Sequence, residues 1–477
     1  MTPTPPEIRF GTDGWRGRVA DDFTIPNVRA VAHVIGEYLR RHRPPGRKPV
    51  VAIGYDTRFL GNRFAEVSAE ALAGHGFTVL LSDGPVPTPT ISLMIRLRRL
   101  SGGIVITASH NPAQYNGVKF KPYYAGPAEP AMTRWFEQHL GRTPLRTMPL
   151  AEGLRRRRIQ RVNFLPQYLA FIRRFLDFAA FRRARLRIAV DAMHGAGDHL
   201  AARALEGTTC RVEVAHGDPH PTFDGRRPEP TGEHLTELCR TVRRGGFDLG
   251  LATDGDADRV GIVDARGRFV TSQETMALLA LHVLEDRRWR GGLAKTVAGT
   301  NVMGKIAEQF RVPIYETPVG FKHIATLMFE GKALFGGEES GGFGISRVMP
   351  ERDGTLMGLL IAEMMLQRRR SLAQLVDDLR RRFGHWVYRR LDVEMEHPLP
   401  KTFAASLAKR LPARLAGRPV RRVATTDGVK ATLDDDSWLL WRASGTEPLL
   451  RVYAEGTSPR QVQQLLAAGR ALARDAA

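Results

Sequence analysis

The chain has 477 residues, of which 43% are hydrophobic and 25% charged, and this length exceeds one ordinary domain core and predicts about three or four units. A formal net charge of +21 would suggest a nucleic-acid partner. However, 61 of the 71 basic residues are arginines scattered over every segment, which resembles a bias in codon composition, so we expect no nucleic-acid partner.

Strand-like and helical stretches alternate along the chain. The first example is a strand over 50–54, a helix over 64–76 and a second strand over 78–81. This alternation is typical of α/β layers with largely parallel sheets.

Breaks in the alternation predict four units. The arginine run Arg155 to Arg158 is interpreted as a solvated linker face, and the strand-like run 186–190 opens a second unit after it. A third unit begins near Arg266 and ends in an apolar helix capped by Asp353, and the break near Gly384 starts a smaller α+β unit. The predicted domains are 1–152, 153–265, 266–384 and 385–477.

A serine follows the apolar strand Ile104 to Ile106 and lies in a small polar turn. The turn carries Ser109 beside His110, and Asn111-Pro112 ends the strand and bends the chain outward. A turn of this composition needs no function, because Ser and Asn favour turns through local hydrogen bonds. Its position at the end of a buried strand nevertheless makes Ser109 a candidate nucleophile.

Three aspartates at alternate positions follow the apolar strand 249–252. Asp254, Asp256 and Asp258 can converge on one hard cation, and without a cation they would repel one another. A calcium loop of the EF-hand type needs glycine at its sixth residue and glutamate at its twelfth, where this chain has Arg259 and Ala265. The spacing therefore favours a magnesium site with an open position for a phosphate.

Two further loops carry polar groups between glycines. Residues 336–342 place Glu338, Glu339 and Ser340 between glycine pairs, which lets the backbone approach a ligand and presents acceptors for sugar hydroxyls. A flexible surface turn would also explain this composition. The second loop, 442–451, combines two arginines, two hydroxyls and a glycine backbone, and we expect it to form a phosphate cradle. The residues of this predicted cradle are Arg442, Ser444, Gly445, Thr446 and Arg451.

Together these segments resemble the α-D-phosphohexomutase family, which includes phosphoglucomutases and phosphomannomutases. The resemblance covers nearly the whole chain, and it rests on motifs that occur in the family's order. In chain order they are 9–17, 54–58, 104–112, 116–120, 190–197, 253–259, 317–322, 336–342 and 442–451. Each motif alone is moderately specific, whereas the ordered set is very specific.

The resemblance implies a fold and a reaction. The fold has three similar α/β domains with mixed, largely parallel sheets, a smaller α+β C-terminal domain, and an active site in the central cleft. Ser109 would carry a phosphoryl group and would hold Mg²⁺ together with Asp254, Asp256 and Asp258. The phosphoryl group would pass to a hexose monophosphate, and glucose 1,6-bisphosphate would be the intermediate and activator.

The resemblance also implies roles for the surrounding residues. Arg16 and Arg259 would stabilise phosphoryl oxygens, Lys119 would act as general acid and base, and His110 would support the loop. Glu338 and Ser340 would grip the sugar hydroxyls, and Lys322 would contact the ligand phosphate or a ring hydroxyl. The loop 442–451 would bind the phosphate that does not react.

Position 342 departs from many relatives. Several of them have histidine where Gly342 closes the sugar loop, so that contact is absent here, and Lys322 and His323 are candidates to replace it. The loss argues against the dual-specificity and glucosamine branches, and the Glu-Glu-Ser sequence is closer to phosphoglucomutases. We therefore expect a glucose 1-phosphate and glucose 6-phosphate mutase, with phosphomannomutase or phosphoglucosamine mutase as the alternative.

The remaining expectations concern compartment and competing functions. Cys210 and Cys239 offer no disulfide framework, residues 1–7 lack a signal-peptide pattern, and no stretch is long and apolar enough for a bilayer. We expect a cytoplasmic monomer or homodimer with no membrane partner. A phosphatase that hydrolyses its phosphoserine would release inorganic phosphate instead of isomerised sugar, and a DNA-binding protein would show salt-dependent retention without mutase activity.

Overall fold

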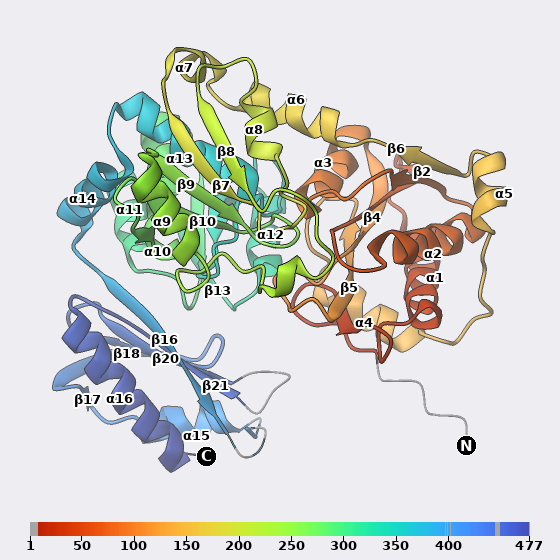
Figure 1. Ribbon diagram of the computed structural model, residues 1–477. Coiled ribbons are helices and arrows are strands. Elements are labelled where there is room, and N and C mark those ends of the chain that lie inside the picture. The colour runs from red at the N-terminus through yellow and green to blue at the C-terminus, as the bar shows by residue number, and fades with distance from the viewer. Residues whose placement is uncertain (1–7, 396, 398, 401, 444–448, 477) are drawn as a thin grey trace.

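The computed structural model describes residues 8–395, 397, 399–400, 402–443 and 449–476 (Figure 1). Four sheets follow one another along the chain, and each belongs to a separate α/β or α+β unit. No helix in these residue ranges is long and apolar enough to cross a membrane.

The first sheet has six strands in the order β1-β5-β4-β2-β3-β6. The four neighbouring strands β4, β2, β3 and β6 are parallel, and β5 is antiparallel to β4. Its strands are β1 (Trp15–Arg18), β2 (Lys48–Tyr55), β3 (Thr78–Ser82), β4 (Leu100–Ile106), β5 (Tyr115–Pro122) and β6 (Ile159–Val162). Its helices are α1 (Ile25–His42), α2 (Gly61–Gly74), α3 (Thr88–Arg98), α4 (Pro130–His139) and α5 (Leu150–Arg155).

Helices cover both faces of this sheet, because side chains alternate along each strand. Val51 and Ile53 pack into the core formed with α1 and α2, whereas Ala52 and Val105 pack into the core that includes α3. All seven residues of β4 are buried. A central strand of this kind explains the apolar run that precedes the serine turn.

The second sheet has the order β11-β10-β9-β7-β8. Its strands are β7 (Arg187–Asp191), β8 (Arg211–Ala215), β9 (Leu249–Thr253), β10 (Val260–Asp264) and β11 (Phe269–Val270). The associated helices are α6 (Leu165–Phe175), α7 (Phe178–Arg183), α8 (Leu200–Ala204), the single turn η1 (Phe223–Gly225) and α9 (Thr236–Gly245).

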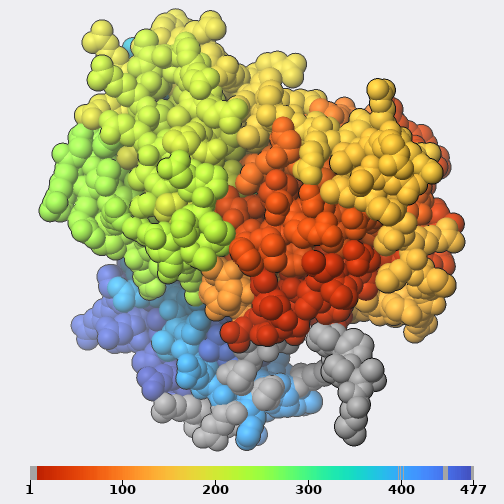
Figure 2. Space-filling model, turned by 45° about the vertical axis from the view of Figure 1, so that its right-hand side comes forward, coloured from red at the N-terminus to blue at the C-terminus, as the bar shows by residue number. Residues whose placement is uncertain are grey.

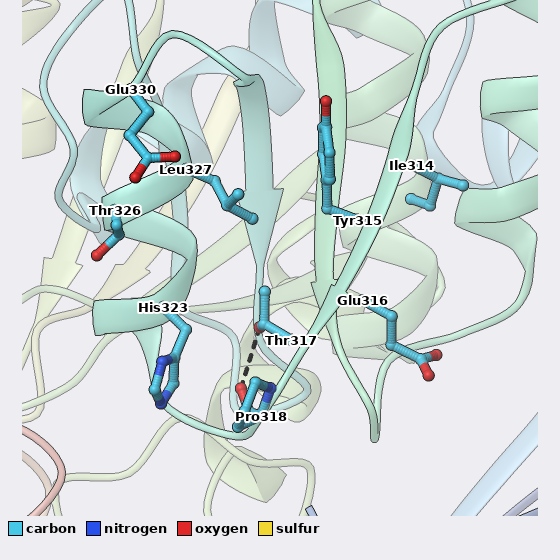
Figure 3. A pocket seen from close by; sticks show the side chains of 9 residues that line it. All are labelled: Ile314, Tyr315, Glu316, Thr317, Pro318, His323, Thr326, Leu327 and Glu330. Atoms are coloured by element: carbon cyan, nitrogen blue, oxygen red, sulfur yellow. Dashed lines mark hydrogen bonds between the residues drawn. The ribbon is translucent and has the colours of Figure 1, made fainter. Parts of the chain in front are cut away.

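The third sheet has the order β13-β12-β14-β15. Its strands are β12 (Gly292–Thr296), β13 (Ile314–Thr317), β14 (Ala333–Gly337) and β15 (Phe343–Ile345). The helices are α10 (Ser272–Leu281), the π-helical turn η2 (His282–Asp286), α11 (Val302–Phe310), α12 (Phe321–Phe329), α13 (Gly354–Arg368) and α14 (Leu372–Phe383). Residues of β13 and α12 line an open groove of about 460 Å³ (Figure 3).

The fourth sheet is antiparallel, with the order β16-β21-β20-β19-β18-β17, and α16 packs against it. Its strands are β16 (Val387–Glu394), β17 (Arg414–Leu415), β18 (Arg418–Ala424), β19 (Val429–Leu433), β20 (Trp438–Ala443) and β21 (Leu449–Gly456). Its helices are α15 (Phe403–Arg410) and α16 (Pro459–Ala476).

The first three units share one continuous core, which includes Ile91, Tyr168, Leu251 and Leu360. The fourth unit has a core of its own around Trp441. In the space-filling view it lies below the N-terminal and second units, which are packed side by side (Figure 2). These features confirm the predicted fold class of three α/β units and a smaller α+β unit.

Two sheets extend beyond the predicted domain boundaries. Strand β6 lies after residue 152 but pairs with β3 of the first sheet, and β11 lies after residue 265 but pairs with β10 of the second. The run Arg155 to Arg158 is exposed as expected, yet it leads from α5 directly into β6 instead of linking two units. We therefore propose boundaries near residues 163 and 271, and we keep the boundary near 384.

Candidate active site

The turn after β4 holds Ser109 in a specific backbone conformation. Ser109 has φ +54° and is 1% exposed, and its N–H donates to Thr107 Oγ1 at 2.8 Å. The left-handed region is unfavourable for a residue other than glycine, so the surrounding contacts must hold it there. Ser109 Oγ donates to Asp254 Oδ2 at 2.7 Å and lies 3.3 Å from His110 Nδ1.

Arg58 stabilises this serine turn through hydrogen bonds to its backbone. Its side chain is buried and donates to four carbonyl oxygens of the turn at 2.6–2.9 Å: those of Ser109, Asn111, Pro112 and Tyr115. Asp56 accepts from Arg58 Nε at 3.1 Å and from Thr107 Oγ1 at 2.6 Å. Burial raises the pKa of Asp56 to about 6 although Arg58 opposes the shift. Both residues belong to the motif 54–58, but the sequence did not predict that they support the turn.

The aspartate loop follows β9 and lies directly against the serine turn. Asp254, Asp256 and Asp258 are fully buried, and one ligand oxygen from each lies within 4.8 Å of the others. A Cβ at Gly255 would come 2.5 Å from the carbonyl oxygen of Ser109, so only glycine permits this approach. Burial and the neighbouring charges of Asp258 and Asp256 raise the pKa of Asp254 well above its ordinary value.

The donor set of this loop fits Mg²⁺. Asp256 Oδ1 and Asp258 Oδ1 are buried and make no hydrogen bond to the described residues. Unpaired buried carboxylate oxygens are unfavourable unless a cation or proton satisfies them. All the available donors are oxygens, which magnesium prefers. Ser109 Oγ, at 2.7 Å from Asp254 Oδ2, is close enough to complete the set.

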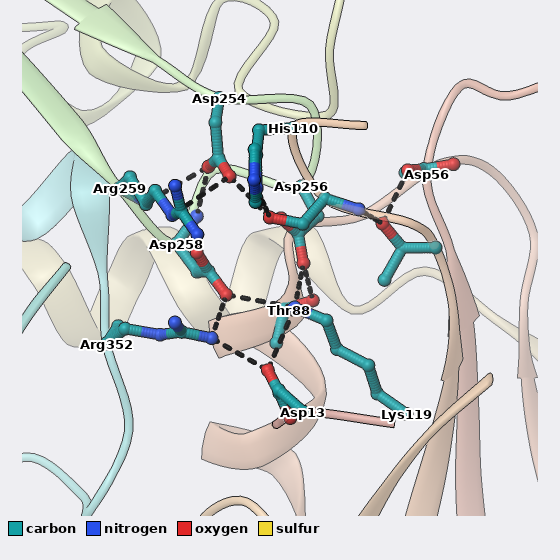
Figure 4. Close-up of polar contacts among 12 residues, drawn as sticks. Asp13, Asp56, Thr88, His110, Lys119, Asp254, Asp256, Asp258, Arg259 and Arg352 are labelled. Carbon is teal, nitrogen blue, oxygen red and sulfur yellow. Dashed lines mark hydrogen bonds and ion pairs between the residues drawn. The ribbon is translucent and has the colours of Figure 1, made fainter. Parts of the chain in front are cut away.

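Lys119 lies on β5 and contacts three carboxylates (Figure 4). Its Nζ lies 2.8 Å from Asp256 Oδ2, 3.0 Å from Asp258 Oδ2 and 3.1 Å from Asp13 Oδ2. Burial lowers the pKa of Lys119, but the charges of Asp13, Asp256 and Asp258 outweigh burial and raise it above its ordinary value. Lys119 is therefore an ammonium ion. This charge state suits a general acid, whereas Lys119 can act as a base only after it has given up a proton.

Arg16, Arg259 and His110 lie at the serine turn and at the aspartate that contacts it. Arg16 Nη1 donates to Asn111 Oδ1 at 2.7 Å, and Arg259 Nε lies 4.0 Å from Asp254 Oδ2. Burial, together with the charges of Arg259 and Arg16, holds the pKa of His110 well below its usual range. His110 is therefore neutral, while Arg16 and Arg259 bring positive charge to the serine turn and to Asp254.

The loop predicted to bind the sugar, 336–342 (the sugar loop below), turns back between β14 and β15. Glu338 N–H donates to the carbonyl oxygen of Gly342 at 3.0 Å, and Thr296 Oγ1 donates to Glu339 Oε2 at 2.8 Å. Burial raises the pKa of Glu338, and the positive charge of Arg352 opposes the shift. Ser340 is half-buried in the same turn.

Arg352 and Asp13 are site residues that sequence reasoning did not predict. Arg352 Nη2 lies 2.6 Å from Asp258 Oδ2 and 2.7 Å from Asp13 Oδ2 (Figure 4), and Nη1 lies 3.2 Å from Glu338 Oε2. The available signal was a triplet of charged residues, 351–353, directly before an apolar helix. Only Asp353 was assigned a role there, as a cap, and its Oδ1 accepts from Leu356 N–H at 2.9 Å.

Lys322 and His323 lie at the start of α12 and have different surroundings. Burial lowers the pKa of Lys322, and Asp13 is the nearby group that opposes the shift, so Lys322 lies near the carboxylate cluster. His323 lines the groove between β13 and α12 with Thr317 and Pro318 (Figure 3). Of the two residues, Lys322 is therefore the one that lies near the carboxylates of the site, and a Cβ at position 342 would meet neither of them within its three nearest contacts.

The loop predicted to bind phosphate, 442–451 (the phosphate loop below), begins in β20 and ends in β21 of the fourth unit. Arg442 and Arg451 are opposite each other in this strand pair, and like charges in that position repel unless an anion lies between them. Arg442 Nε donates to Asp427 Oδ2 at 2.7 Å, and the same oxygen accepts from Val319 N–H at 2.9 Å. Ser444, Gly445 and Thr446 lie outside the described residues.

Comparison with known proteins gives a consistent result over the whole chain. Four family models match, described as phosphoglucomutase/phosphomannomutase alpha/beta/alpha domain I (residues 7–145), domain II (166–267) and domain III (271–383), and the C-terminal domain (394–471). A phosphoglucomutase/phosphomannomutase of Thermococcus kodakarensis is 30% identical, with 96% of this chain and 97% of that protein covered. A phosphoglucosamine mutase of Nitrosospira multiformis is 31% identical, with 95% and 93% covered.

Solved structures show the same arrangement. A crystal structure from Thermus thermophilus, provisionally named a phosphomannomutase, superimposes with a TM-score of 0.86 at 33% identity and covers 99% of this chain and 100% of that one. An N-acetylphosphoglucosamine mutase of Aspergillus fumigatus, solved with GlcNAc-6P and magnesium, has a TM-score of 0.62 at 14% identity, over 99% and 97% of the two chains. The latter shows a shared fold alone.

Proposed function

Because the chain belongs to the phosphoglucomutase/phosphomannomutase family, we propose that it interconverts glucose 1-phosphate and glucose 6-phosphate through a phosphorylated Ser109. Membership in this family makes the chain a phosphohexomutase, an isomerase of carbohydrate metabolism. The observation that carries the proposal is the contact of Ser109 Oγ with Asp254, at 2.7 Å, in a buried site that contains three aspartates, a lysine and two arginines. Related mutases act on glucosamine phosphate, so the choice of sugar needs its own test.

In the proposed reaction, phosphorylated Ser109 gives its phosphoryl group to the free hydroxyl of a hexose monophosphate. The bond between Oγ and phosphorus breaks and the bond between the sugar oxygen and phosphorus forms. The proton of the sugar hydroxyl passes by way of a base to Oγ, so that Ser109 ends as a hydroxyl. Glucose 1,6-bisphosphate then turns in the site, and its other phosphoryl group returns to Ser109. Because phosphoryl transfer depends mainly on positioning and charge, Arg16 and Arg259 contribute by stabilising the phosphoryl oxygens.

Lys119 is proposed to transfer the proton of the sugar hydroxyl. It contacts Asp256 and Asp258, whereas Ser109 contacts Asp254. The ammonium ion of Lys119 is held by Asp13, Asp256 and Asp258, so it can donate a proton to the sugar oxygen when a phosphoryl group leaves that oxygen for Ser109. By microscopic reversibility, Lys119 without that proton accepts the proton of the sugar hydroxyl when the phosphoryl group moves from Ser109 to the sugar. Neutral His110 orients the serine turn.

Ser109, Asp254, Asp256 and Asp258 are the residues that would hold Mg²⁺. When bound, the ion adds positive charge that stabilises the transferring phosphoryl group. The four side chains present oxygen donors, and the two buried oxygens Asp256 Oδ1 and Asp258 Oδ1 have no other partner among the described residues. A distant relative of the same fold was solved with magnesium, which is consistent with this assignment.

The phosphate loop gives a prediction about affinity. Replacing Arg442 with alanine should raise KM for glucose 1-phosphate by roughly tenfold to a hundredfold, because a hydrogen bond to a charged group is worth about 1.5–3 kcal/mol. We propose that Arg442, Arg451, Ser444, Gly445 and Thr446 bind the phosphate that does not react. Steady-state kinetics would measure the change. Arg389→Ala, an exposed arginine on β16, is the matched control, and an unchanged KM in Arg442→Ala would place the cradle elsewhere.

The sugar loop gives a prediction about substrate choice. Glu338 and Ser340 are proposed to grip the C3 and C4 hydroxyls, with Lys322 as a further contact, whereas glucose and mannose differ at C2. We expect higher kcat/KM with glucose 1-phosphate than with mannose 1-phosphate, and measurable turnover of both, because one unpaired polar contact can separate two sugars. A panel that includes glucosamine 1-phosphate, each with a trace of its bisphosphate, tests this. A higher kcat/KM with mannose 1-phosphate or glucosamine 1-phosphate would contradict the proposed substrate and identify that sugar phosphate as the substrate instead.

A further inference from the structure

We propose that Arg352 is a positioning residue that occupies the place of a side chain at position 342 and fixes the sugar loop to the aspartate loop. The inference rests on the proposed function for its kinetic consequences. Its geometric basis is independent of any substrate, because it concerns contacts between residues of the chain itself.

The guanidinium of Arg352 joins carboxylates from three units. It contacts Asp13 Oδ2 at 2.7 Å from the first, Asp258 Oδ2 at 2.6 Å from the second, and Glu338 Oε2 at 3.2 Å from the third. Arg352 is 5% exposed, and its guanidinium also lies over the ring of Phe321 at 5.6 Å. A planar group with several fixed donors suits such a junction, which the single nitrogen of lysine cannot reproduce.

Gly342 and Arg352 are sterically complementary. A Cβ at Gly342 would lie 2.4 Å from Arg352 Cδ and 3.2 Å from Arg352 Cγ. A long side chain on the surface could move away at little cost. Arg352 cannot move without leaving its three carboxylates, because it is enclosed among them. The glycine is therefore needed for the contacts of Arg352, and the space beside it is already filled.

These contacts fix which carboxylate oxygens face a ligand. Arg352 takes Oδ2 of Asp258, so that Oδ1, which is buried without a hydrogen bond to the described residues, is left for a cation. It takes Oε2 of Glu338, so that Oε1 is the oxygen left for a sugar hydroxyl. One side chain thereby sets the orientation of a proposed metal ligand and of a proposed sugar ligand.

A double-mutant cycle tests this inference with the full-length protein. We expect Arg352→Ala and Gly342→Ala each to raise KM and the calorimetric dissociation constant for hexose 1-phosphates by roughly tenfold or more. In the Arg352→Ala background, which lacks the clashing Cγ and Cδ, Gly342→Ala should change either constant by less than about twofold. Arg352→Lys should restore part of the loss because it keeps a charge. Arg347→Ala, at an exposed arginine five residues earlier, should resemble the wild type.

The same cycle in urea unfolding separates the possible outcomes. The effects of Arg352→Ala and Gly342→Ala on the free energy of unfolding should be non-additive without any ligand, and this expectation does not depend on which sugar the protein binds. Additive effects in unfolding, or unchanged hexose phosphate binding in Arg352→Ala, would overturn the inference. A wild-type protein that neither binds nor converts any hexose phosphate would instead overturn the proposed function, and the unfolding cycle would still decide whether Arg352 and Gly342 are complementary.

Discussion

Replacement of Ser109 by alanine is expected to abolish steady-state mutase activity, which is the largest effect that we expect from any single substitution in this chain. A mutase of the proposed type stores the phosphoryl group on Ser109 between the two half-reactions, and alanine offers no atom to carry it. Removing a nucleophile costs several orders of magnitude in kcat, because the remaining groups have nothing to stabilise. A coupled assay that follows glucose 6-phosphate formation would measure the loss.

The fold should survive this substitution. Ser109 Oγ has one strong partner, Asp254 Oδ2, and the backbone of the turn is held separately by Arg58. Circular dichroism and thermal unfolding should therefore resemble those of the wild type. Ser346→Ala, at a half-buried serine in the third unit, is a suitable control. Near-normal turnover of the purified Ser109→Ala protein would remove Ser109 from the mechanism.

Chelation is expected to abolish activity, and added Mg²⁺ should restore it. The expectation follows from three buried aspartates whose oxygens lie within 4.8 Å of one another, two of them with an oxygen that has no hydrogen bond to the described residues. Asp256→Asn should lower kcat by roughly a hundredfold or more, because it removes one charge from the group that would hold the ion. Activity measured against Mg²⁺ concentration, after dialysis with a chelator, is the test.

Asp256 also contacts Lys119, so loss of activity alone would not separate the two roles. A changed Mg²⁺ dependence in Asp256→Asn identifies the metal role, whereas a changed pH profile with unchanged Mg²⁺ dependence identifies the lysine. Asp434→Asn, at an exposed site in the fourth unit, controls for the loss of one negative charge. Full activity in excess chelator, with no metal bound, would contradict the assignment.

The sequence was most informative where function depends on neighbours along the chain. An apolar run that ends at Ile106 predicted a buried strand, and the strand places Ser109 at its end. The alternating spacing of Asp254, Asp256 and Asp258 predicted convergence, and the three carboxylates do converge. In both cases local geometry determines the arrangement, because a strand end and a tight loop leave few alternatives.

The sequence was least informative where distant segments meet. Arg352 contacts Asp13, Asp258 and Glu338, which are separated from it by up to 339 residues, and no local pattern predicts such a junction. Strand β6 was missed because its sequence, Ile-Gln-Arg-Val, is short and half polar, as expected at a sheet edge. The interpretation of Gly342 as a lost contact was incomplete, because only the structure shows that Arg352 fills the space beside it.

The most direct test of the account is the location of the phosphoryl group. Purified protein would be incubated with Mg²⁺ and glucose 1,6-bisphosphate, and the intact protein and its peptides would then be analysed by mass spectrometry. We expect one phosphoryl group, on Ser109, that is lost on mixing with excess glucose 1-phosphate as bisphosphate forms. Turnover of glucose 1-phosphate by a protein that carries its phosphoryl group on another residue, or on none, would contradict the account.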